Sequence, residues 1–446
     1  MILVTLNVRY RRSELTYMLS HSGAKAVLTP ASNQNFDLAQ LYGELTEELP
    51  GLMEVFYFDP PSGMPGYSDL LAGDADAAAL GRYRSEVGGE TPAVILFTSG
   101  TTGRPKGATI THGSIIASAQ AQVDHFGLNE NDRLAGHMPF NHVGGVTCTL
   151  VVSLLARSSA ALMETFSPKA TIELIRSGGL TFFLGVPTMY VLIMADPSFA
   201  SLDTSMLRYI VAGGANVEPR LCEEIARSFP NATLCNFYGL SETSGACIIS
   251  PLDDSLEQVS SSLGAAIGDF SLRAFGASGV LGSDEEGELQ VRGECVVAGY
   301  WADPSETSKA ISDDGWLSTG DMVTISKDGH VTLKGRKKEM FIQGGYNVYP
   351  VEVENLLTSH PKVAMAAGIG VADQVLGEVG RYYVVPRGSE LPTVAELDEF
   401  CRERLANYKV PREYVFVEEL PLTPVGKIQK AILASTVKAP VQKVGK

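Results

Sequence analysis

Up to about Gly264, short apolar runs alternate along the chain with amphipathic stretches. Runs such as KAVLTP, AVILFTSG and LTFFLGVP end in glycine, proline or polar residues, as buried strands do. Between them lie helix-like stretches such as SPKATIELIRSG, where Ser167 can cap the first turn, Pro168 suits its first position and Gly178 can end the helix. This alternation predicts layered α/β architecture.

The pattern then changes twice. GELQVRG and MVTISKDGHVTLKGR indicate strands joined by turns, with KDGH as a hairpin turn, so a small β-rich subdomain is predicted at residues 264–337. Beyond it, YPVEVENLLTSH and TVAELDEFCRERLA read as helices among further strands, typical of a small α+β unit. We therefore predict a large N-terminal domain at residues 1–337 and a small α+β C-terminal domain at residues 338–446. The last ten residues, which are basic, are expected to form a frayed tail.

Composition restricts the classes of function. A chain of 446 residues exceeds what one core usually supports. The net charge of −16 argues against binding to nucleic acid or an anionic membrane. The most apolar stretch, VTCTLVVSLLARSSAALM, is interrupted by Arg157, which favours a buried helix and strand over a membrane span. Six scattered cysteines without a C-x-x-C pair suggest reduced thiols and a cytoplasmic location.

The stretch LFTSGTTGRPKGATITH, residues 96–112, carries the densest chemistry. Its glycines let backbone N–H groups approach an anion, its hydroxyls add donors, and Lys106 adds a positive charge. The pattern differs from Walker A, because Lys106 follows Pro105 and Gly107 stands where a Ser or Thr would bind Mg²⁺. The stretch therefore predicts a phosphate-binding loop of another kind.

This loop resembles the phosphate-binding signature of the adenylate-forming superfamily, the AMP-dependent synthetases and ligases that include acyl-CoA synthetases. Five further stretches occur in the order of that family: NFYGLSET, GELQVRG, STGD, GRKKEMFIQGGYNVYPVEVE and PLTPVGKIQK. With the loop they extend from residue 96 to residue 430. The resemblance implies a large α/β N-terminal domain and a small C-terminal domain that is mobile.

The resemblance also implies a set of ATP-binding residues. Those expected to hold the phosphates are Thr98, Ser99, Gly100, Thr102, Gly103 and Lys106. Those expected beside adenine are Gly213, Gly214, Ala215, Asn236, Tyr238 and Gly239. Tyr238 offers a flat face for the base and Asn236 an amide for its edge. Thr101 and Glu242 are expected to be catalytic and to bind Mg²⁺, for which a carboxylate is a suitable hard ligand.

Two further positions are expected at the ribose, and four in the C-terminal domain. Asp321 would accept hydrogen bonds from the ribose hydroxyls, and Arg336 would reach the same ribose and a phosphate. By resemblance, Lys427 is the catalytic lysine that bridges the acid and the α-phosphate, where it stabilises the charge that develops at phosphorus. Lys338 would be the hinge about which the C-terminal domain rotates before thioester formation. Gly344 and Gly345 would then border the coenzyme A tunnel.

The acid substrate is constrained by the expected acyl pocket. MPFNHVGG places His142 where the family gates the carboxylate site, and we expect it to be catalytic. The expected pocket walls are small and uncharged: Val143, Gly144, Val186, Gly214, Gly239, Ser244 and Gly245. Without a charged wall, a hydrophobic monocarboxylic acid is expected: fatty, aromatic or alicyclic. The predicted partners are this acid, ATP and coenzyme A, with no nucleic acid and no stable membrane insertion; a homodimer is left open.

Two alternatives to an acyl-CoA synthetase stay open. An acyl-AMP ligase would load a carrier protein, although the tight run between Asp321 and Arg336 favours coenzyme A as acceptor. The match to the family also begins at a segment that usually lies further from the N-terminus, as though roughly 60–80 residues were missing by typical domain lengths. A start-site effect, a trimmed chain or a truncated non-catalytic remnant that binds nucleotide or acyl groups would each explain this beginning.

Overall fold

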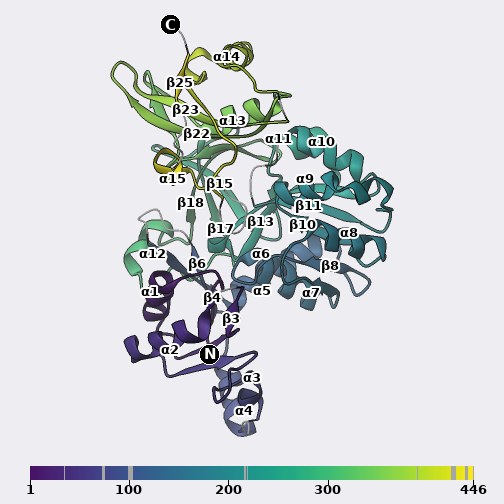
Figure 1. The fold of residues 1–446 in the computed structure, drawn as a ribbon, viewed down its shortest axis with the longest axis vertical. Helices are drawn as coiled ribbons and strands as arrows, with labels where there is room; N and C mark the ends of the chain where they lie inside the picture. The colour runs from purple at the N-terminus through teal and green to yellow at the C-terminus, as the bar shows by residue number, and fades with distance from the viewer. Residues whose placement is uncertain are drawn as a thin grey trace.

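The computed structural model describes residues 1–34, 36–72, 76–98, 104–214, 217, 219–388, 390–422, 428–436 and 440–444. Figure 1 shows an N-terminal unit at the bottom, helices and strands in layers at the right, and the C-terminal unit at the top. The predicted α/β class, with a β-rich part and a small α+β unit at the C-terminal end, is confirmed. Within the described residues, no helix is both long and apolar enough to cross a membrane.

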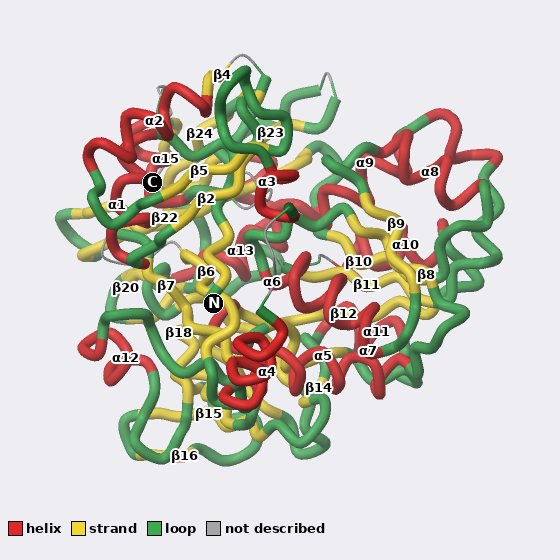
Figure 2. Tube along the Cα trace, turned by 90° about the horizontal axis from the view of Figure 1, so that it is seen from below, coloured by secondary structure: helices red, strands yellow, loops and turns green. Residues whose placement is uncertain are grey.

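The largest sheet has seven strands in the order β14-β13-β12-β11-β10-β8-β9. Its strands are β8 (Arg133–Gly136), β9 (Ser159–Leu162), β10 (Phe182–Gly185), β11 (Tyr209–Gly213), β12 (Thr233–Leu240), β13 (Gly245–Ile249) and β14 (Ala265–Ala266). The pairs from β9 to β12 are parallel, whereas β13 and β14 continue the sheet antiparallel. Helices cover both faces of the parallel part (Figure 2), which explains why its strands are almost wholly apolar.

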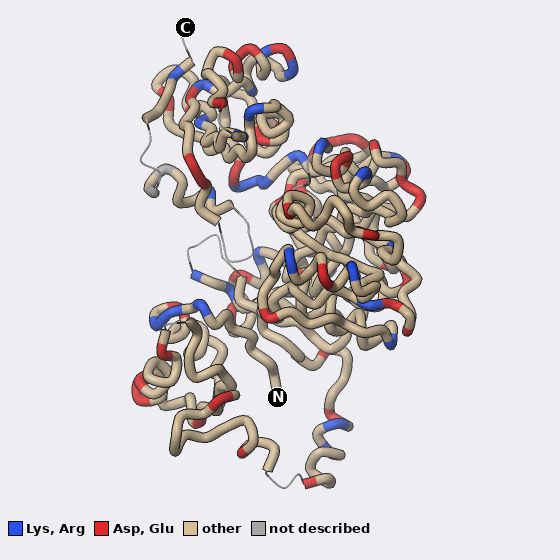
Figure 3. Tube along the Cα trace, turned by 45° about the vertical axis from the view of Figure 1, so that its right-hand side comes forward, with Lys and Arg blue, Asp and Glu red and all other residues tan. Residues whose placement is uncertain are grey.

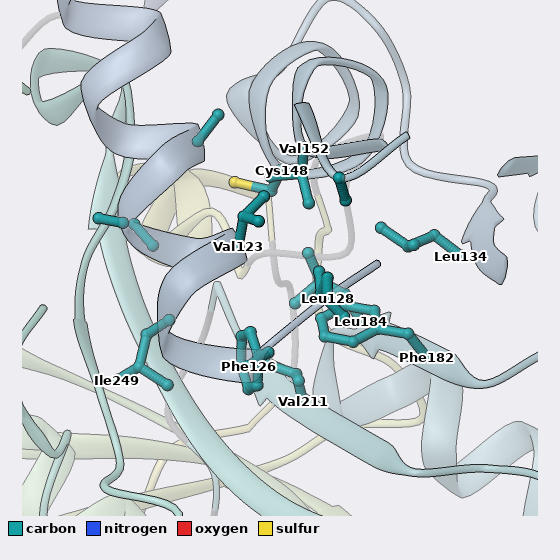
Figure 4. Packing of buried hydrophobic residues seen from close by; sticks show 14 of the residues in the cluster. Val123, Phe126, Leu128, Leu134, Cys148, Val152, Phe182, Leu184, Val211 and Ile249 are labelled. Carbon is teal, nitrogen blue, oxygen red and sulfur yellow. The ribbon is translucent and has the colours of Figure 1, made fainter. Parts of the chain in front are cut away.

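Side chains that alternate along these strands build one core on each face of the sheet. The covering helices are α5 (His112–Phe126), α8 (Pro168–Arg176), α9 (Pro187–Ala195) and α10 (Pro219–Ser228). Phe182 packs with Phe126 of α5 in the cluster of Figure 4. Phe183, its neighbour in sequence, packs with Tyr190 of α9 in the opposite core. Ser167 accepts a hydrogen bond from the Ala170 N–H at 3.3 Å, so the predicted cap of α8 is confirmed.

Among its described residues, the N-terminal unit holds a three-stranded sheet, a parallel strand pair, an antiparallel strand pair and four helices. These elements are β1 (Leu3–Thr5), α1 (Arg12–Ser22), β2 (Ala26–Thr29), β3 (Ser32–Asn33), β4 (Phe36–Asp37), α2 (Leu38–Glu48), β5 (Glu54–Tyr57), α3 (Tyr67–Leu71), α4 (Ala77–Glu86), β6 (Pro92–Thr98) and β7 (Lys106–Thr111). β1 pairs in parallel with β6, and β6 pairs antiparallel with β7. This last pairing brings Thr98 opposite Lys106, at the base of the predicted phosphate loop.

The β-rich part is a five-stranded antiparallel sheet in the order β16-β15-β17-β18-β19. Its elements and the neighbouring helices are α11 (Leu256–Ser261), β15 (Ser271–Gly276), β16 (Gly279–Val280), β17 (Gly287–Arg292), α12 (Pro304–Ala310), β18 (Leu317–Ile325) and β19 (Val331–Arg336). The Ser326 N–H donates to the His330 carbonyl at 2.9 Å, so the hairpin turn predicted at KDGH is confirmed.

The C-terminal unit packs helices on a further sheet. Its elements are β20 (Phe341–Gln343), β21 (Tyr346–Val348), α13 (Pro350–Ser359), β22 (Val363–Asp373), β23 (Gly377–Pro386), α14 (Val394–Arg402), β24 (Glu413–Phe416), α15 (Lys430–Thr436) and β25 (Gln442–Lys443). β25 pairs with β24, and Lys443 lies 3.2 Å from Glu413. The prediction of a frayed tail is therefore wrong for residues 442–443, because an open strand edge is available to them.

Candidate active site

Acidic and basic residues are interspersed along all parts of the described chain (Figure 3), so an anion site must come from local groups. At the base of the predicted phosphate loop, the Lys106 ammonium pairs with the carboxylate of Glu306 on α12. It also lies 5.0 Å from the centre of the Tyr300 ring. Of the other residues predicted to hold phosphate or metal in this loop, Thr98 is the last residue of β6. The rest lie outside the described residues: Ser99, Gly100, Thr101, Thr102 and Gly103.

Glu242 lies on the short 3₁₀ helix η3 (Ser241–Thr243), between β12 and β13. One oxygen of its carboxylate accepts a hydrogen bond from the Tyr300 hydroxyl at 2.9 Å. Burial, followed by the charge of Glu242, raises the pKa of Tyr300, so the phenol stays protonated and remains a donor. Tyr300 therefore contacts both predicted anion-handling residues, Lys106 through its ring and Glu242 through its hydroxyl. Sequence reasoning missed Tyr300, because this residue lies in none of the stretches that carry the resemblance.

The predicted ribose residues form a hydrogen-bonded cluster. The register of β18 and β19 sets Asp321 opposite Arg336, and the Arg336 Nε lies 2.7 Å from the Asp321 Oδ1. The Tyr238 hydroxyl donates to the other carboxylate oxygen at 2.5 Å. Asp321 is 2% exposed, whereas the Arg336 side chain is 40% exposed, so the arginine can still reach a ligand. Burial and the charge of Asp321 raise the pKa of Tyr238 well above its ordinary value. Residues predicted from three separate motifs thus meet at one place.

The Asn236 side chain is already engaged by the backbone. Its Nδ2 donates to the Ser262 carbonyl at 2.9 Å, and its Oδ1 accepts from the Phe237 N–H at 2.8 Å. These contacts indicate a structural role in holding β12, and the predicted contact with adenine stays a prediction.

Glycine is required where β11 and β12 end. A Cβ on Gly213 would lie 2.2 Å from the Phe237 carbonyl, and one on Gly239 would lie 2.0 Å from the Gly245 carbonyl. Gly214 has φ +73°, a conformation that favours glycine. Ala215 lies outside the described residues. The backbones at this edge therefore approach too closely to admit a side chain at Gly213 or Gly239.

His142 lies at the start of α6 (Val143–Gly145), and its Nδ1 accepts from the Gly144 N–H at 3.0 Å. The chain continues as the π-helix η1 (Val146–Val151) and the helix α7 (Val152–Leu155). The helix and strand predicted for VTCTLVVSLLARSSAALM are therefore confirmed, the strand being β9. Turns of π-helix often occur at functional sites. His137, nearby in sequence, stacks on Phe183 with 4.8 Å between ring centres. Burial lowers the pKa of His137 to about 4, so this ring is neutral.

The predicted hinge precedes the C-terminal sheet directly, because β20 begins shortly after Lys338. Gly344 and Gly345 form the two-residue turn between β20 and β21, with φ +61° and +87°, as a type I′ hairpin requires. After this turn, Tyr346 stacks on Tyr408 with 4.5 Å between ring centres. Gly345 and Asn236 both line a cleft of about 870 Å³.

Lys427 lies outside the described residues, but both flanks of its segment are anchored. Leu422 pairs with Ile428 in an isolated β-bridge. Lys430, at the start of α15, lies 2.7 Å from Glu339 and 2.8 Å from Glu354. These contacts fix the ends of the short segment that carries the predicted catalytic lysine. In the part of the chain that the structure describes, no three His, Cys, Asp or Glu side chains gather as a metal site.

Two family models match the chain. One, described as AMP-binding enzyme, covers residues 1–301, and the other, the AMP-binding enzyme C-terminal domain, covers residues 352–427. A mitochondrial medium-chain acyl-CoA ligase of Mus musculus is 33% identical over 455 residues, which cover 96% of this chain and 74% of that protein. A second relative, from Rhodococcus jostii, is named as the CoA ligase of a methyl-dioxo-octahydroindenyl propanoate; it is 34% identical over 97% of this chain and 83% of its own length.

The fold agrees with these sequence matches. The crystal structure of ATP-bound MatB from Rhodopseudomonas palustris has a TM-score of 0.88 and 29% identity. The match covers 98% of this chain and 83% of that one.

Proposed function

Because the chain belongs to the AMP-binding enzyme family of adenylate-forming ligases, we propose that it is an acyl-CoA synthetase acting on a hydrophobic monocarboxylic acid. The observation that carries this proposal is the cluster of Asp321, Arg336 and Tyr238, held together by bonds of 2.5 and 2.7 Å. It offers an aromatic face, a carboxylate and a guanidinium within one site, as recognition of a ribonucleotide requires.

The proposed reaction has two steps. An oxygen of the acid attacks the α-phosphorus of ATP, the bond from that phosphorus to the bridging oxygen breaks, and acyl-AMP and pyrophosphate form. The sulfur of coenzyme A then attacks the acyl carbon, the thiol proton is lost to solvent, and AMP leaves with the oxygen that joined the acid to phosphorus. No side chain forms a covalent intermediate, so the protein contributes positioning and charge stabilisation.

We assign the phosphates to Lys106 and the loop before it, and the ribose to Asp321 and Arg336. Lys427 would stabilise the additional negative charge of the first transition state, where a fixed cation is most effective. His142 would lie beside the carboxylate of the acid.

Glu242 and Thr101 are the proposed ligands of the Mg²⁺ that accompanies ATP. The donor type suits this ion, which takes one or two carboxylates together with phosphate oxygens. The Tyr300 hydroxyl occupies one oxygen of Glu242 and orients the carboxylate. When bound, Mg²⁺ would neutralise phosphate charge.

The expected walls of the acyl pocket support a hydrophobic acid. Val143 and Val186 are buried, and Gly245 packs so tightly that a Cβ there would lie 2.6 Å from the Ser118 Oγ. The relatives reported above are named for a medium-chain acyl group and for a fused-ring propanoyl group. We therefore propose a fatty or alicyclic chain in preference to a dicarboxylate.

We propose coenzyme A as the acceptor and Lys338 as the hinge between a domain of residues 1–337 and one of residues 338–446. Rotation there would bring the turn of Gly344 and Gly345 to the thiol. A cytoplasmic location remains part of the proposal, although one relative reported above is mitochondrial.

The test is acid-dependent release of pyrophosphate with Mg²⁺-ATP across fatty, aromatic and alicyclic acids, followed by coenzyme A–dependent thioester formation. We expect both products with at least one acid class. A thioester on a carrier protein alone would favour the acyl-AMP ligase alternative, and ATP binding without pyrophosphate release would favour a non-catalytic protein. As a matched control, Lys427→Ala should abolish pyrophosphate release and largely spare thioester formation from supplied acyl-AMP.

A further inference from the structure

The predicted phosphate-binding lysine already has an anionic partner inside the protein. Lys106 pairs with Glu306, and their side chains are only 15% and 18% exposed. The hydrogen bond from Lys106, followed by that from Lys309, lowers the pKa of Glu306 to about 2, so this carboxylate is charged at neutral pH. A fixed negative charge at this place would repel the phosphates of ATP, unless its side chain moves.

The backbones that carry the two partners are locked together. The Trp301 N–H donates to the Gly107 carbonyl at 2.7 Å, and the Thr109 N–H donates to the Gly299 carbonyl at 2.9 Å. Asp303 caps α12 by accepting from the Glu306 N–H at 3.0 Å. The distance between the two backbones is thus fixed, and only side-chain rotation can part Lys106 from Glu306.

Glu306 has a second cation within reach. The Lys309 ammonium lies 2.6 Å from the other carboxylate oxygen, and the Lys309 side chain is 67% exposed. Two ammonium groups therefore share one carboxylate. Glu306 can keep an ionic partner when Lys106 turns to another anion, because Lys309 lies on the same helix, three residues on.

We propose that Glu306 competes internally with pyrophosphate for Lys106. In the empty site, Glu306 pairs with Lys106. While the phosphates of ATP are bound, Glu306 pairs with Lys309 alone. After acyl-AMP has formed, Glu306 pairs with Lys106 again and speeds the departure of pyrophosphate. This proposal rests on the proposed function, because it takes Lys106 to hold the β- and γ-phosphates. No bond is made or broken in the exchange; only ionic partners change.

If Glu306 only positioned Lys106, its removal would have the opposite effect on affinity. Removal of a positioning charge would loosen the Lys106 ammonium and weaken the binding of phosphate groups. Removal of a competitor frees the ammonium and strengthens the binding of phosphate groups. The sign of the change in affinity therefore separates the two roles, and loss of folding cannot imitate a gain in affinity.

The experiment is calorimetric titration of Mg²⁺-pyrophosphate into the full chain and into Glu306→Gln. We expect the variant to bind pyrophosphate about tenfold more tightly, the scale of one charge-assisted hydrogen bond, and to release it more slowly in single turnover. In a Lys106→Met background the same substitution should leave the affinity unchanged. Lys309→Gln, which removes the alternative partner, should weaken pyrophosphate binding.

Unchanged or weaker binding by Glu306→Gln would overturn the proposal, as would an equal gain in the Lys106→Met background. If Glu306→Gln does not fold, the Lys309→Gln variant decides, because tighter or unchanged binding there contradicts the exchange of partners. A wild type that binds pyrophosphate but catalyses no acid-dependent exchange of pyrophosphate into ATP would refute the proposed function, while the comparison of affinities still decides the competition at Lys106.

Discussion

The Asp321 cluster makes a quantitative prediction about nucleotide binding. Asp321→Asn keeps the shape of the side chain but removes the charge that accepts from Arg336 at 2.7 Å and from Tyr238 at 2.5 Å. If this carboxylate also holds the ribose hydroxyls, the ligand loses a charge-assisted hydrogen bond worth about 1.5–3 kcal/mol. The Kd for ATP should then rise by about 10- to 100-fold.

The same substitution has a smaller effect on stability. Asp321 is buried, but the Arg336 side chain is 40% exposed, so water can solvate the guanidinium that is left unpaired. We expect a loss of about 1–2 kcal/mol in the free energy of unfolding, below the figure for breaking a fully buried pair. That corresponds to a fall in Tm of only a few degrees, roughly, for a domain of this size.

The assay is titration of Mg²⁺-ATP by calorimetry without acid substrate, together with thermal unfolding of the free protein. Tyr238→Phe is the matched control, because it removes the hydroxyl donor to Asp321 and keeps the ring. Its Kd for ATP should stay within about threefold of the wild type, a change below about 1 kcal/mol, because the Asp321 carboxylate and the aromatic ring both remain. A wild-type Kd for Asp321→Asn combined with a lowered Tm would show that the carboxylate is structural and would refute the ribose assignment.

Three other predictions concern stability and the hinge. Burial lowers the pKa of His330, but its bond at 3.0 Å to Asp254 and the charges around it outweigh this effect and raise the pKa above 6.5. The resulting stabilisation is full below about pH 6.5 and is lost as the pH rises through the folded-state pKa. The free energies of urea unfolding of the wild type and of His330→Gln should therefore differ most near pH 6. Lys430→Met leaves the buried Glu354 carboxylate without its cation and should destabilise the C-terminal unit by about 3–5 kcal/mol, measured by hydrogen exchange of that unit. Lys338→Pro should spare pyrophosphate release but slow thioester formation by roughly tenfold or more in stopped-flow measurements, because the fixed φ of proline restricts rotation at the hinge. Equal loss of both steps would contradict the assignment of the hinge to Lys338.

Local patterns predicted the elements and several site residues for identifiable reasons. Parallel strands buried on both faces leave continuous apolar runs, so β10 was visible in the sequence as the run LTFFLGVP. Asp321 and Arg336 lie in separate motifs, yet the antiparallel register of β18 and β19 places them opposite each other. Their closeness thus follows from a short hairpin between the two strands.

Contacts between distant segments were not predictable in this way. Glu306 meets Lys106 across 200 positions of sequence, and nothing near either residue signals the other. Tyr300 was missed for the same reason. Asn236 shows the opposite case. Its motif suggests a ligand contact, but its side-chain amide forms hydrogen bonds with the backbone of Ser262 and Phe237. β25 depends on a free edge of β24, which the terminal sequence does not reveal.

The fate of a labelled carboxylate oxygen tests adenylate formation most directly. An accepted acid carrying ¹⁸O in both carboxylate oxygens would be converted with ATP and coenzyme A, and the nucleotide product analysed by mass spectrometry. Attack of the acid on the α-phosphorus predicts AMP with one ¹⁸O atom, formed in equal amount to the acyl-CoA. Unlabelled AMP, or ADP with the label in inorganic phosphate, would contradict activation of the acid as acyl-AMP.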